Sequence, residues 1–172
     1  MELNMQADNH ECPLPAGRFE GREAFRQLVR DALTGAASQA WPELVLSDFD
    51  FADWPLGEKE VVESLHRWAG HRRRLTMLAG NFDAVARLHP RFVHWRVRWD
   101  HVVVARKART LGSEEMPSVL WSPMWMLQRL DPVRSNGVSS REAQRLTWQR
   151  EQLDEWLQSR SAPGFPASVL GL

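Results

Sequence analysis

Apolar residues recur along the chain with two different spacings, and these spacings predict which segments are helices and which are strands. Near the N-terminus one apolar face repeats every three or four residues, which predicts a helix over 21–39. This face comprises Phe25, Leu28, Val29, Ala32 and Leu33. The same spacing predicts a helix over 57–71 and a closing helix over 139–159. Two short apolar runs, 44–46 and 75–79, instead predict strands that are buried on both faces.

The segment 92–99 fits both spacings. Apolar residues occupy every second position from Val93 to Trp99, as in a half-buried strand, but Phe92, Trp95 and Trp99 also recur as on a helix. A strand here would run on into the next apolar stretch and reach about 15 residues, against a usual range of roughly three to ten. We therefore predict a helix up to Trp99 and a strand from His101 onward.

The order of these elements predicts an α/β fold. Helices and strands alternate in the first half of the chain, which favours a parallel core sheet with helices on both faces. A hairpin is predicted over 118–130 and a loop over 131–138. We expect a single domain over 18–160, built on a mixed, mostly parallel sheet of about five strands. The segments 1–17 and 161–172 are rich in proline and glycine and are predicted to be flexible tails.

Composition excludes several classes of protein. The chain has one cysteine, Cys12, so a disulfide framework and a cysteine metal site are excluded. No apolar run approaches the roughly 18 residues of a membrane span, and the N-terminus does not resemble a signal peptide, so a cytoplasmic protein is expected. No phosphate-binding glycine loop, nucleophile elbow or paired-histidine zinc spacing occurs. We therefore expect no cofactor and no metal.

Charge is balanced over the whole chain but uneven along it. Residues 41–63 carry a net charge of −6, and residues 71–110 carry +8. In the predicted helix that Pro90 opens, Arg91, His94 and Arg98 share one face, and Trp95 and Trp99 flank it. Arginine binds phosphate through two hydrogen bonds and aromatic rings stack on bases, so this face is a candidate site for an anionic ligand or single-stranded nucleic acid. The alternative is an ordinary amphipathic helix with buried tryptophans and solvated arginines.

Carboxylates follow the first buried strand. Asp48 and Asp50 resemble the first motif of haloacid dehalogenase-type phosphatases, which implies a nucleophilic Asp48, a general acid Asp50 and a magnesium ion between them. The chain departs from that family, because Phe51-Ala52 replaces the Gly-Thr of the motif and Ala79 stands where the next strand should end in serine or threonine. The alternative is that these carboxylates, with Asp53, cap a helix or a turn.

A second resemblance covers the chain from Phe19 to Trp156. The strand-helix units, the hairpin and the closing helix are similar to one half of a phospholipase D superfamily fold, and the chain resembles uncharacterised bacterial phospholipase D-like domains. The catalytic His-x-Lys-x-x-x-x-Asp signature of that superfamily falls on Glu115, Pro117 and Ser122. The resemblance therefore implies a relative that lacks the catalytic residues.

The final helix predicts self-association. Its apolar arc docks on the sheet, and this arc comprises Ala143, Leu146, Leu153 and Leu157. Trp148 and Trp156 fall outside the arc, and large exposed apolar groups often mark a contact surface. Phospholipase D-type halves commonly pair, so the resemblance also implies a homodimer.

These patterns together favour a non-catalytic, phospholipase D-like binding or oligomerisation module. Its ligand is expected to be a phosphate-bearing molecule or nucleic acid, bound through the basic face, with no membrane contact. A haloacid dehalogenase-like, magnesium-dependent phosphatase is the alternative function. A purely structural partner-binding domain is the third.

Overall fold

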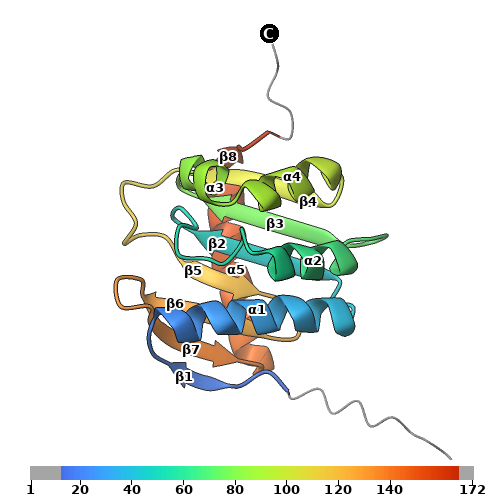
Figure 1. The fold of residues 1–172 in the computed structure, drawn as a ribbon. Coiled ribbons are helices and arrows are strands. Elements are labelled where there is room, and N and C mark those ends of the chain that lie inside the picture. The colour runs from blue at the N-terminus through green and yellow to red at the C-terminus, as the bar shows by residue number, and fades with distance from the viewer. Residues whose placement is uncertain (1–12, 167–172) are drawn as a thin grey trace, which may run out of the picture.

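The structure is a computed structural model that describes residues 13–166, in which one eight-stranded sheet carries helices on both faces (Figure 1). The helices are α1 (Arg22–Ser38), α2 (Lys59–Trp68), α3 (Asp83–Leu88), α4 (Pro90–Arg98) and α5 (Ala143–Ser159). The strands are β1 (Gly17–Phe19), β2 (Glu43–Asp48), β3 (Arg74–Ala79), β4 (Val103–Ala108), β5 (Ser118–Trp121), β6 (Met126–Asp131), β7 (Asn136–Ser140) and β8 (Ser161–Pro163).

The sheet is mixed, and its strand order is β1-β7-β6-β5-β2-β3-β4-β8. Only β2, β3 and β4 run parallel to one another, and the other five pairings are antiparallel. The predicted α/β sheet with helices on both faces is confirmed, but the prediction of about five mostly parallel strands is wrong. The difference arises because β5 returns antiparallel beside β2, with Trp121 opposite Val45, and the chain then adds β6 and β7 as a meander.

Two apolar layers hold the helices on the sheet. α1, α2, α3 and α4 cover one face and α5 covers the other (Figure 1). The larger core lies under the first four helices and includes Phe25, Leu65 and Phe92. Under α5 a smaller layer joins Val45 to Leu153. Because β2 contributes to both layers, its apolar run is buried on both faces, as predicted.

The ambiguous segment 92–99 lies in a helix. Pro90 occupies the first turn of α4, where its missing N–H costs no hydrogen bond. The predicted loop over 131–138 is wrong, because β7 begins at Asn136. Ser139, expected as a helix cap, instead donates its hydroxyl to the Pro15 carbonyl at 2.7 Å, and α5 begins at Ala143.

The described parts of the predicted tails are packed against the sheet. At the N-terminal side, Trp125 Nε1 donates to the Pro15 carbonyl at 3.0 Å. At the C-terminal side, β8 pairs with β4, and Phe165 stacks on Phe82 with ring centroids 4.9 Å apart. The flexible-tail prediction is therefore wrong for 13–17 and 161–166, and its remaining residues, 1–12 and 167–172, lie outside the described part of the chain. Over 13–166, none of the helices combines the length and the apolar character that crossing a membrane requires.

Candidate functional site

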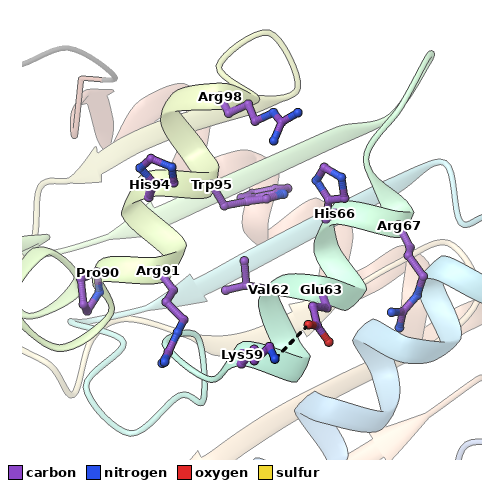
Figure 2. Close-up of a pocket in the computed structure, with 10 residues that line it drawn as sticks. All are labelled: Lys59, Val62, Glu63, His66, Arg67, Pro90, Arg91, His94, Trp95 and Arg98. Carbon is purple, nitrogen blue, oxygen red and sulfur yellow. Dashed lines mark ion pairs between the residues drawn. The ribbon is translucent and has the colours of Figure 1, made fainter.

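Helices α2 and α4 lie side by side on the sheet and border an open groove of about 900 Å³ (Figure 2). Each helix buries one face in the core, through Leu65 and Trp68 on α2 and through Phe92 and Trp95 on α4. The adjoining stripes of each helix face outward and line the groove. The lining residues, called here the α2–α4 groove, are Lys59, Val62, Glu63, His66, Arg67, Pro90, Arg91, His94, Trp95 and Arg98.

Most of the predicted basic face meets in this groove. Arg91, His94 and Arg98 are exposed and line it, while Trp95 is only 3% exposed and lies at its base. Trp99 does not line the groove, but its Nε1 donates to Nδ1 of the groove residue His66 at 3.3 Å.

The sequence reasoning missed the wall that α2 contributes. Lys59, Glu63, His66 and Arg67 lie four, seven and eight residues along from the first, which is one polar stripe of a helix. The stripe could have been read from the sequence. What could not be read is that α2 packs next to α4, so that the stripe faces Arg91 and Arg98 across the groove (Figure 2).

The positive charge of the groove is largely uncompensated. Lys59, Arg67, Arg91 and Arg98 line it, and the one lining carboxylate is Glu63, 3.9 Å from Lys59. Among residues 13–166, the three arginines form no ion pair with a carboxylate. Arg91 donates to the Gly57 carbonyl at 3.1 Å and Arg67 to a serine hydroxyl at 3.2 Å.

Arginines elsewhere in the fold are neutralised. Arg30 binds Glu58 at 2.7 Å, and that hydrogen bond holds the pKa of Glu58 below its usual range. Arg150 contacts Glu43 at 2.6 Å on the opposite side of the sheet. The free guanidinium groups of the groove are therefore a local feature, and they give this surface a field that attracts anions.

The carboxylates after β2 form a buried turn. One oxygen of Asp48 accepts from Arg129 Nη2 at 2.8 Å, and the other accepts from the Phe51 amide at 2.9 Å. Asp50 accepts from the Ala52 amide at 2.9 Å, and Asp53 contacts Arg129 at 3.3 Å.

This geometry fits the capping alternative better than a phosphatase site, because both oxygens of the would-be nucleophile Asp48 are occupied by structural partners. Within 13–166, no group of three histidine, cysteine, aspartate or glutamate side chains is placed to hold a metal ion.

The two tryptophans of the predicted interface differ in their environment. Trp148 is 54% exposed on α5, as the prediction requires. Trp156 is only 8% exposed and packs with Leu78, Ala108 and Met116, so its predicted position outside the buried arc is wrong. The loop that carries Met116 covers it, and this contact has no signal in the periodicity of α5.

Comparison with known proteins identifies a fold and no family. No family model matches the chain, and no curated protein matches it. Among solved structures, the chain is similar to TrmBL2, described as an archaeal chromatin protein with a novel mode of DNA binding, at a TM-score of 0.63 and 12% identity. The match covers 89% of this chain but 56% of TrmBL2, so the chain spans little more than half of that protein. At this identity the likeness establishes the arrangement of helices and strands alone.

Proposed function

We propose that this protein is a non-catalytic binding module that holds a phosphate-bearing ligand, of which nucleic acid is the favoured class, in the α2–α4 groove. One observation carries the proposal: four cationic side chains from two helices border one open groove that contains a single carboxylate. The described DNA binding of TrmBL2, which has a similar fold, is compatible with this ligand class.

The groove combines the two kinds of contact that such a ligand needs. Arg98 lies at one end of it and Arg91 with Lys59 at the other, so cationic groups are spaced along its length (Figure 2). Guanidinium groups match phosphate oxygens geometrically, and an ammonium group acts as a point charge. Between these ends, Val62 and Trp95 provide an apolar base for a sugar or base. A groove of this composition binds chemically mixed ligands better than simple anions.

Double substitution of Arg91 and Arg98 by alanine tests the proposal. The affinity of the full chain for a fluorescently labelled oligonucleotide is measured by anisotropy over a series of salt concentrations. We expect the variant to bind more weakly at every salt concentration, because each lost phosphate contact also lowers the slope of log K against log salt, by about 0.7 for a single strand.

The matched control replaces Arg134 and Arg145, which removes the same charge from elsewhere on the surface. These side chains are 79% and 57% exposed and each lies beside a carboxylate. The control should bind nearly as tightly as the wild type. Equal losses in both variants would mean that overall charge, and not the groove, determines binding. Absence of binding by the wild-type protein at low salt would refute the proposal.

The likeness to half of a phospholipase D fold, without its catalysis, is part of this proposal. The positions that correspond to its catalytic signature have structural partners here: Glu115 contacts Arg160 at 3.0 Å, and the Ser122 hydroxyl bonds within its own turn to Trp125. The Pro117 carbonyl accepts from Ser47 at 2.7 Å. None of these side chains supplies a nucleophilic histidine or a phosphate-binding lysine, which supports a binding role.

A further inference from the structure

We infer that the ligand is a single strand of nucleic acid, and that its path continues from the α2–α4 groove past Trp99 into a second basic hollow beside the loop that precedes β3. This inference rests on the proposed function and names both the ligand class and the rest of its route.

The second hollow adjoins the first. It has a volume of about 590 Å³ and is lined by Gly70, His71, Arg72, Arg73, Trp99, His101 and Val102. Trp99, in this hollow, donates to His66, in the groove, at 3.3 Å, so the two depressions share a border. No carboxylate is among the residues that line the second hollow, and Arg72 and Arg73 add two positive charges to the track.

Three aromatic rings stand in a row at this border. The Trp99 ring centroid lies 5.7 Å from that of His66 and 5.6 Å from that of His101. Both histidines are exposed and Trp99 is half-buried. The hydrogen bond to His66 fixes the indole in place, so stacking on it costs little side-chain entropy.

This arrangement selects single strands over duplexes. Bases of a single strand are free to stack on aromatic rings while the phosphates follow basic side chains, which is how sequence-tolerant single-strand surfaces work. A duplex keeps its bases stacked inside and offers Trp99 only its backbone. An aromatic row between two basic hollows therefore contributes to affinity for a single strand and adds little for a duplex.

The loop also places an arginine in an unfavourable backbone conformation. Arg72 has a φ of 62°, a region that residues other than glycine seldom adopt. The side chain is exposed and lines the second hollow. Strain of this kind is found at binding sites, where it positions a functional group. It also supplies a clean test, because Arg72→Gly relieves the strain while it removes the charge.

The experiment compares four labelled probes by anisotropy: oligo(dT) of about 15 and of about 4 nucleotides, oligo(U) of about 15, and a blunt duplex of about 15 base pairs, lengths that bracket the known range of single-strand site sizes. We expect both long single strands to bind more tightly than the duplex, and their ratio shows whether DNA or RNA is preferred. Trp99→Leu should weaken the long strands by about five- to tenfold, the usual effect of losing one stacked base.

Two further variants separate the path from the fold. Trp99→Phe also loses the bond to His66 but keeps an aromatic ring, so it should retain most of the affinity that Trp99→Leu loses. Arg72→Gly should keep or raise the melting temperature, because it relieves the strain at φ 62°, and yet weaken the long strands more than the short one.

The outcomes distinguish this inference from the function on which it rests. If the wild-type protein binds none of the probes, the proposed function itself is wrong. If the duplex binds as tightly as the single strands and the Arg91 and Arg98 variant weakens both, the function stands and the single-strand inference is overturned. If single strands are preferred but neither Trp99→Leu nor Arg72→Gly changes their affinity, the route past Trp99 is overturned.

Discussion

Individual charged residues in this protein either are neutralised inside the fold or face solvent at the groove. Asp48 and Arg129 belong to the first group, because each is about 95% buried and their side chains meet at 2.8 Å. Arg129 also donates to the Ser118 hydroxyl and lies over the Phe25 ring, 4.5 Å from its centroid. Removing one partner of a buried ion pair leaves the other charge without compensation, which typically costs about 3–5 kcal/mol.

Asp48→Asn should therefore lower the free energy of unfolding by about 3–5 kcal/mol, measured by urea denaturation. The matched variant Asp50→Asn should change it by less than about 0.5 kcal/mol, since Asp50 is partly exposed and an asparagine oxygen can still accept from the Ala52 amide. A phosphatase would lose activity with either change. Equal and small effects on stability, with a phosphatase activity that both variants abolish, would contradict the structural role of Asp48.

Elements on the groove side of the sheet are joined by a buried histidine. His89, between α3 and α4, donates from Nε2 to the Phe51 carbonyl in the turn after β2 at 2.8 Å. Gly57 permits this close packing, because a Cβ there would lie 3.0 Å from the Leu88 carbonyl oxygen. Burial lowers the pKa of His89 below its ordinary value of 6.5. The unfolded chain therefore binds more protons than the folded protein at pH values just below 6.5.

The free energy of unfolding should consequently fall as the pH is lowered from 6.5 toward the pKa of the folded protein. The contribution of His89 to this fall is at most about 1.4 kcal/mol per pH unit. His89→Gln removes the titration but keeps an N–H donor, so its unfolding free energy should change less between pH 7.5 and 5.5, values that span about the relevant range. All other histidines are common to both proteins, so an identical pH dependence in the two would contradict this role.

The whole molecule offers one exposed aromatic side chain away from the groove and protects both edges of its sheet. The edge strands β1 and β8 have three residues each, too short a ladder for stable pairing with another chain. On α5, Trp148 is 54% exposed, and Met124 in the β5–β6 turn is 56% exposed. Large exposed apolar groups of this kind are typical of contact surfaces, so the homodimer stays a prediction with Trp148 as its centre.

Light scattering at tens of micromolar protein should show a dimer, and Trp148→Glu should shift it toward monomer by placing a charge in the apolar contact. Gln144→Glu adds the same charge at another exposed position of α5 and should leave the dimer intact. A monomeric wild-type protein would refute the prediction. A dimer that Trp148→Glu does not weaken would place the interface elsewhere.

The sequence by itself determined the features that arise from neighbouring residues. The apolar spacing of α1, the buried runs of β2 and β3, and the helical assignment of Pro90–Arg98 were all correct, because a helix or strand must bury one face wherever it packs. The same local geometry placed Arg91, His94 and Arg98 on one stripe of α4. These predictions needed no knowledge of the partner that each element contacts.

Only the tertiary structure decided which elements become neighbours. The three-residue strands β1 and β8 are too short to show any period, and β7 lies in a segment of turn residues, so the sheet was predicted with too few strands. Strand direction depends on pairings such as β2 with β5, which are distant in the sequence. The burial of Trp156 depends on Met116, and the second wall of the groove depends on α2 docking beside α4. Contacts between distant segments form where complementary surfaces meet in space, and the spacing of residues within one segment carries no record of that partner.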